Sequence, residues 1–224
     1  MQDTFWIMRP ATSFYDFVAH DRHVFLPNLG SFDDVLAPYR ALRDLTKWGG
    51  EALFGGLSEV ELNLDDSFRP NLIWEAGVHV FSEKLVNALD CGSDTVWHVP
   101  VVDYRAMERR LGQRYDLALV LPCREAVDLE RSSVKLLEIP DRPRKLDAIG
   151  ESFPTIPKVV VQSMETLVPN EQLDVEVGLF RDSITGSLCV SERLAKQVVE
   201  AGISDVQFES MSFVAGEPRK LRHE

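Results

Sequence analysis

The feature that most constrains the fold is residues 186–209, GSLCVSERLAKQVVEAGISDVQFE, because this stretch spells a strand, a helix and a second strand in one run. The apolar residues at 188–190 are typical of a short strand. Ser191 follows directly, and its side chain can accept a hydrogen bond from the free amides at a helix start. The sequence therefore predicts a helix that begins there.

The residues after this serine support the helix and mark its end. Glu192 lies in the first turn, where the helix dipole favours a carboxylate, and Leu194 and Val198 recur at helical spacing. Gly202 is expected to end the helix, because glycine adopts the positive φ often needed at this position without steric cost. Alternating apolar residues beyond it predict the second strand.

The same order of signals occurs earlier, in residues 77–99, GVHVFSEKLVNALDCGSDTVWHV. Its string Ser-Glu-Lys-Leu at 82–85 aligns with Ser-Glu-Arg-Leu at 191–194, and each helix is followed by a glycine and a Ser-Asp pair. We therefore expect two related strand-helix-strand units. Strands that lead into capped helices commonly use Ser, Glu and Leu, so the match is also explained without a duplication, and both interpretations stay open.

The rest of the chain alternates strand and helix patterns. Residues 38–48 carry apolar side chains at helical spacing before Gly49 and Gly50, which predicts a helix that stops at the glycines. Residues 115–121, YDLALVL, are nearly all apolar and predict a central strand. Four prolines within 140–157 predict a long loop. Shorter strands are expected at 5–8, 60–64, 135–139 and 158–162.

Composition indicates a globular protein with a real core, because 45% of the 224 residues are hydrophobic. No run of about 20 apolar residues could span a membrane. The first residues lack the pattern of a secretion signal, so the cytoplasm is the expected compartment. The three cysteines are far apart, which favours neither a disulfide framework nor a zinc ribbon. The expected fold class is α+β, a mixed or antiparallel sheet with flanking helices, in a single domain over residues 1–224.

Charge points to the kind of partner. The chain has 24 Lys and Arg against 36 Asp and Glu, which gives a formal net charge of −12. A field of this sign repels phosphate backbones, so nucleic acid is not an expected partner, whereas a basic protein would be attracted. Many soluble proteins are equally acidic, so charge alone does not identify the function.

The motifs of catalysis and metal binding are missing from the sequence. It has no Gly-x-Ser-x-Gly elbow and no Gly-rich phosphate loop, and the pairs His20/His23 and Asp33/Asp34 fall short of a ligand set. We therefore predict no catalytic, cofactor-binding or metal-binding residues.

The string DLERS at 128–132 is the basis of an alternative function. Asp128, Glu130 and Arg131 follow a central strand and could form the site of a hydrolase or transferase together with a distant histidine. The structural interpretation is an ordinary ion pair between Asp128 and Arg131, three residues apart on a helix.

Three blocks of the sequence resemble a bacterial immunity-protein family. The blocks are residues 71–89, NLIWEAGVHVFSEKLVNAL, residues 115–132, YDLALVLPCREAVDLERS, and residues 179–208, LFRDSITGSLCVSERLAKQVVEAGISDVQF. The family was first defined on a myxobacterial protein of polymorphic toxin systems and was formerly a domain of unknown function. Residues 1–70 resemble it only loosely.

The resemblance implies an α+β protein that binds and neutralises a cognate toxin. With a cytoplasmic location, the target would be a nuclease or another toxin that acts in the cytoplasm. Asp65, Asp66 and Phe68, in the polar turn before the first unit, are the predicted contact residues, because acidic and aromatic side chains suit a basic protein partner. An adaptor that uses an exposed sheet edge is a further possibility that the sequence does not separate from an inhibitor.

Overall fold

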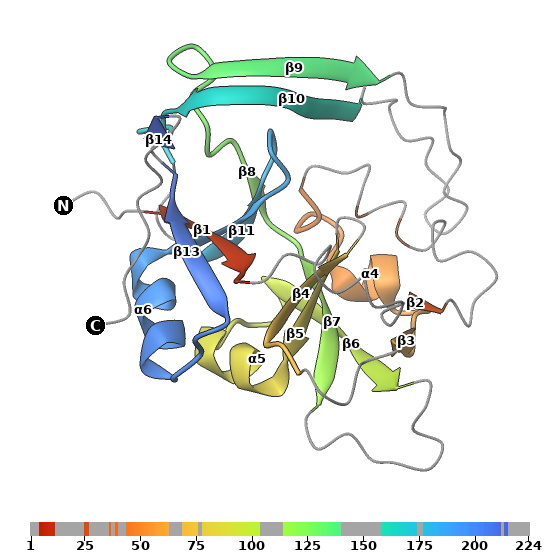
Figure 1. Ribbon diagram of the computed structural model, residues 1–224. Coiled ribbons are helices and arrows are strands. Elements are labelled where there is room, and N and C mark those ends of the chain that lie inside the picture. Colours follow the sequence, from red (N-terminus) through yellow and green to blue (C-terminus); the bar gives the residue numbers. More distant parts are fainter. Residues whose placement is uncertain are drawn as a thin grey trace.

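The structure is a computed structural model, and it describes residues 5–11, 25–26, 36, 39, 44–62, 69–75, 78–103, 114–139, 158–173, 177–211 and 213–214. The largest sheet has the strand order β2-β3-β6-β7-β5-β4 (Figure 1). Its strands are β2 (Phe25–Leu26), β3 (Val60–Leu62), β4 (Leu72–Glu75), β5 (Val78–Ser82), β6 (Val96–Asp103) and β7 (Tyr115–Val120).

A second sheet has the order β13-β1-β12-β11-β8, and a third has the order β14-β10-β9. Their strands are β1 (Phe5–Pro10), β8 (Cys123–Arg124), β9 (Ser133–Ile139), β10 (Lys158–Leu167), β11 (Leu179–Asp182), β12 (Leu188–Ser191), β13 (Val206–Ser210) and β14 (Phe213–Val214). The helices among the described residues are α4 (Gly50–Phe54), α5 (Glu83–Leu89) and α6 (Glu192–Glu200). The predicted α+β class with mixed sheets and flanking helices is confirmed.

The two expected units share one topology. In the first unit, made of β4, β5, α5, β6 and β7, the helix connects β5 to β6, and β7 lies between these two strands, antiparallel to both. In the second unit, made of β11, β12, α6, β13 and β1, the helix connects β12 to β13, and β1 lies between them, again antiparallel to both. The inserted strand follows β6 in the first unit and comes from the start of the chain in the second.

Both helices begin at the predicted serine. The Oγ of Ser82 accepts a hydrogen bond from the amide of Leu85 at 3.1 Å, and the Oγ of Ser191 accepts one from the amide of Leu194 at 3.4 Å. Each satisfies an amide that the helix leaves without an internal partner. The N-cap assignment from sequence is therefore confirmed at both sites.

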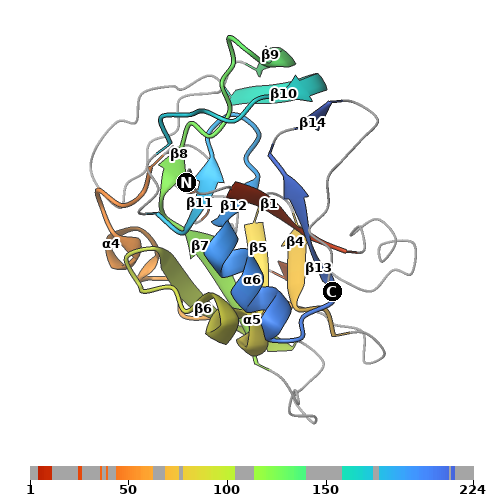
Figure 2. The same cartoon turned by 90° about the vertical axis from the view of Figure 1, so that its left-hand side faces the viewer.

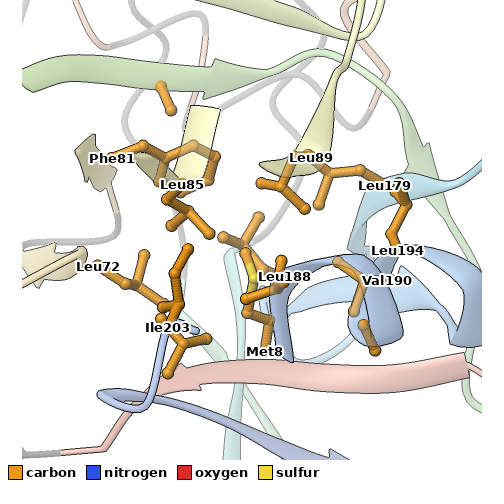
Figure 3. Close-up of a cluster of buried hydrophobic side chains, with 14 of the residues drawn as sticks. Met8, Leu72, Phe81, Leu85, Leu89, Leu179, Leu188, Val190, Leu194 and Ile203 are labelled. Carbon is orange, nitrogen blue, oxygen red and sulfur yellow. The ribbon is translucent and has the colours of Figure 1, made fainter. Parts of the chain in front are cut away.

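One hydrophobic core joins the two units. The helices α5 and α6 lie against each other in front of the sheets (Figure 2). Buried side chains from both helices and from both large sheets meet beneath them, among them Leu72, Leu85, Leu188 and Leu194 (Figure 3). Burial of this much apolar surface holds the units together, at about 25 cal/mol for each Å² removed from water.

Each of the two larger sheets also has a core on its other face. Behind the largest sheet, Tyr39, Phe54 and Leu117 belong to one cluster. Behind the second sheet, Phe5, Phe180 and Leu167 belong to another, and the last of these comes from β10. The third sheet is thus anchored to the body at the end of β10.

The helix predicted over 38–48 is described only in part: residue 39 is helical, but residues 44–48 are not, so the predicted end of the helix is wrong. Residues 46–48 form a turn, in which Asp44 accepts hydrogen bonds from the amide and hydroxyl of Thr46. The amide of Leu45 donates to the carbonyl of Leu121 at 2.9 Å, so contact with the end of β7 replaces a helical hydrogen bond. The helix α4 begins at Gly50, the residue that was expected to end one.

The two helices end differently. After α6, Gly202 has φ +69°, as predicted. After α5 the left-handed residue is Asp90, with φ 44° and ψ 46°, and not Gly92, the glycine that follows this helix. Aspartate tolerates this conformation better than most residues, and Gly92 lies two residues further along the chain.

Candidate partner-binding surface

The predicted contact residues Asp65, Asp66 and Phe68 lie outside the described residues, and so do His20, His23, Asp33 and Asp34. The structure therefore leaves the contact assignment a prediction. The described part of the chain has no group of three or more His, Cys, Asp or Glu side chains that could hold a metal ion. Over the same part, no helix is long and apolar enough to cross a membrane.

The string at 128–132 forms a capped surface turn. One carboxylate oxygen of Asp128 accepts hydrogen bonds from the amides of Glu130 at 3.0 Å and Arg131 at 3.2 Å. The Arg131 guanidinium pairs with Glu171, and it lies 3.9 Å from the other oxygen of Asp128. The predicted ion pair is present, but on a turn and not on a helix.

This turn leads into a projecting hairpin. Strands β9 and β10 pair antiparallel from Ser133 to Ile139 and lie above the rest of the molecule (Figure 1). The base of the hairpin is tied down, because the amide of Asp128 donates to the carbonyl of Val168 and the amide of Val168 donates to the Ser132 hydroxyl, both at 2.9 Å. Val134 also packs against the core behind the second sheet. A fixed base therefore carries an exposed arm.

Two apolar side chains are exposed on this segment. Leu129, in the turn, is 40% exposed, and Leu137, in β9, is 49% exposed. The third large hydrophobic residue of this kind among the described residues is Trp74 on β4, at 37%. An exposed leucine costs free energy in water, so Leu137 on the projecting strand and Leu129 in the turn at its base are candidate contact points for a partner.

Acidic side chains gather around Leu129 and the base of the hairpin. The exposed residues Glu125, Glu130, Glu165 and Glu171 and the half-buried Asp128 lie on the turn, on β10 or close to their ends. The basic residues of the turn and of the two strands are Arg131, already paired with Glu171, Lys135 and Lys158. The surface therefore presents apolar groups in a negative field, which suits a positively charged protein.

A buried polar pair lies on the helix-bearing face of the first unit. Asp116 is 5% exposed and accepts a hydrogen bond from the Arg114 Nε at 3.1 Å, and the His98 Nδ1 lies 3.8 Å from its other oxygen. Burial lowers the pKa of His98, while Asp116 acts in the opposite direction. Neutral His98 is therefore the favoured form near neutral pH.

His79 is buried beneath Trp74, with the ring centroids 5.8 Å apart. Burial, reinforced by Arg181, lowers the pKa of His79 to about 3. A base of this strength is a poor proton acceptor for catalysis near neutral pH, and the stacking on Trp74 indicates a packing role for His79.

The leucines at 129 and 137 were missed by sequence reasoning. Leu129 stands between two acidic residues in DLE, and Leu137 is the second leucine of KLLEI. In a strand, neighbouring leucines face opposite sides, so one of the pair at 136–137 had to leave the core unless both faces were covered. That signal was readable, but the sequence did not show that one face of β9 is bare.

No model of a known protein family and no curated protein matches the chain. The resemblance of its three blocks to an immunity-protein family therefore stays a prediction.

Proposed function

We propose that the chain is an immunity protein, which binds a cognate toxin and neutralises it in the cytoplasm. The observation that carries the proposal is the exposure of Leu137 on the projecting arm and of Leu129 in the acidic turn at its base, because this arrangement suits recognition of a protein. An inhibitor that acts by binding needs such a surface on a rigid body.

The positions of the three resembling blocks support the proposal. The first block spans β4, β5 and α5, the second spans β7, β8 and the turn, and the third spans β11, β12, α6 and most of β13. The blocks thus cover both helices and most strands of the two units, without β6 and β1, whereas β9 and β10 lie between the second block and the third. A shared framework that carries a separate arm is what members of a family with different toxins would need.

The net charge supports a basic protein as the toxin. At −12, the chain attracts a positively charged partner over distances of about a Debye length, roughly 8 Å at physiological salt. Many toxins that act on nucleic acid need a basic surface to hold phosphates. An acidic inhibitor would compete with that substrate for the same surface.

Co-expression with the product of the immediately upstream gene tests the proposal. We expect that product alone to arrest growth, and this chain to restore growth and to co-purify with it. We also expect the complex to weaken as salt is raised, because charge steers the association. A harmless neighbour, or toxicity that persists when this chain is well expressed, contradicts the proposal.

A further inference from the structure

We infer that the outer edge and bare face of β9, together with Leu129, form the docking surface, and that the occupant is an extended segment of a positively charged protein. This inference rests on the proposed function and names the surface that would perform it. Its elements are the free edge of a strand, an apolar contact and the local charge.

The edge of β9 is long and open. Each sheet ends in strands that pair on one side, and among the described strands β9 is the longest of these, with seven residues against five in β13. An edge strand presents unpaired amide and carbonyl groups, and an incoming strand satisfies them by adding to the sheet. An extended segment is therefore the chain conformation that fits the edge.

The bare face of β9 supplies the apolar contact. Ser133, Lys135 and Leu137 alternate along the strand and are exposed, whereas Val134 points toward the core behind the second sheet. Leu137 is the most exposed large hydrophobic residue of the described chain. A strand added beside β9 would place its own side chains next to Leu137 on that face, which removes the leucine from water.

The charge around the edge selects the partner. The described residues 125–139 and 158–173 hold six acidic residues and three basic ones, so the local net charge is −3. Arg131 is already paired with Glu171 and Asp128. An incoming segment rich in Lys or Arg is attracted, and an acidic one is repelled.

Binding of the purified upstream gene product to the complete chain, measured by calorimetry, tests the inference with Leu137→Lys, Leu137→Glu and Glu130→Lys. We expect Leu137→Lys to weaken binding at least tenfold, and more than Leu137→Glu does, because the added charge repels a basic segment. We expect Glu130→Lys to weaken it several-fold. Since Leu137 and Glu130 are both exposed, thermal unfolding of all three variants should match the wild type.

Glu200→Lys is the matched control for charge. Glu200 is exposed at the end of α6, which lies far from β9 in Figure 1. This variant changes the net charge as much as Glu130→Lys does, and it should bind within about twofold of the wild type once salt is at physiological strength.

The outcomes separate the inference from the proposed function. Wild-type chain that fails to bind the upstream product overturns both. Wild-type binding that Leu137→Lys retains in full overturns the docking surface alone. A dimer in light scattering that Leu137→Lys makes monomeric also overturns the inference, because a second copy of the chain then occupies the edge.

Discussion

The two units have the same frame, meaning the same strand pairing and helix cap, and differ in the residues that surround it. Ser82 and Ser191 cap equivalent helices, and the amides of these serines donate to the carbonyls of Asn71 and Gly178, the residues just before β4 and β11. Just beyond the inserted strands, the amide of Leu121 donates to Thr95 and the amide of Ala11 donates to Asp205. The same backbone contacts thus recur in both units.

The side chains at equivalent positions differ. His98 and Asp116 in the first unit correspond to Phe208 and Trp6 in the second, so a polar pair replaces an apolar one. Trp74 corresponds to Arg181, whose guanidinium lies 4.3 Å from the centre of the Tyr39 ring and donates to the carbonyl of Val120.

The outer edges of the two units differ as well. Strand β11 has β8 added in parallel at its outer edge, whereas no described strand adds to β4. The comparison shows that strand pairing and helix caps define the frame, and that the residues around it are free to serve other purposes. The proposed docking surface lies outside both frames.

Shortening one buried side chain in each of the two inserted strands should lower the stability of the protein by similar amounts. Ile7 of β1 and Leu117 of β7 occupy equivalent registers and are both buried on the faces away from the helices. We expect Ile7→Ala and Leu117→Ala each to lower the free energy of unfolding in urea by about 2–5 kcal/mol, because each leaves a cavity. A loss below about 1 kcal/mol in one of them alone would show that the inserted strands are not equivalent.

Replacing His79 tests the difference in polarity between the two units. His79 corresponds to Leu188, so His79→Leu makes the first unit more like the second. Its folded pKa of about 3 lies below the ordinary 6.5, so the unfolded chain binds a proton between these values that the folded chain does not. Stability contributed by neutral His79 is therefore present above pH 6.5 and falls as the pH drops toward 3.

We expect the free energy of unfolding of the wild type to fall more steeply between pH 7 and pH 5 than that of His79→Leu. The difference in slope approaches about 1.4 kcal/mol per pH unit below the unfolded pKa. His98 and the carboxylates are the same in both proteins and cancel in the comparison. The free energy of unfolding is measured by urea titration of both proteins at pH 7 and pH 5. An equal change between the two pH values in both proteins would contradict the lowered pKa of His79.

The helix caps should differ in cost. Ser191→Ala removes one capping bond and should cost about 1 kcal/mol. Ser82→Ala should cost about 1 kcal/mol more, because the Ser82 hydroxyl also donates to the Asn71 side chain at 2.7 Å. Asn71 in turn donates to the Asp205 carboxylate from its amide and its side chain, which links the units. Equal losses in thermal unfolding would show that this link contributes nothing.

The helix ends offer the smallest test. Gly202→Ala should lower stability by about 1 kcal/mol, and Asp90→Gly should raise it by up to about 1 kcal/mol, because both positions have positive φ. A Cβ at Gly202 would meet only the Lys84 Nζ, at 3.9 Å, so the expected loss is backbone strain and not a clash. Changes of the opposite sign in the free energy of unfolding in urea would contradict the assignment of positive φ to these two positions.

Much of the frame could be predicted because its signals are local. A serine before a helical pattern, an apolar run such as 115–121 and a glycine after a helix each act within a few residues. The strand order could not be predicted in this way. The insertion of β1 between β12 and β13 depends on contacts between the two ends of the chain, which no local pattern contains.

The candidate surface was harder to predict than the frame. The turn at 128–132 was noticed for its charges, but its role as the base of an arm depends on bonds to Val168. The predicted helix fails over 44–48 for the same reason, since the amide of Leu45 donates to the carbonyl of Leu121 at the end of a distant strand. In both places tertiary contact decides, and propensity is a weak guide.

The most direct test of the account is the survival of cells that express the upstream gene product together with wild-type chain, Leu137→Lys or Glu200→Lys at equal levels. The account predicts that the wild type and Glu200→Lys protect the cells and that Leu137→Lys fails to protect them. Equal protection by all three would contradict the inference that β9 forms the docking surface, and protection by none would contradict the proposed function.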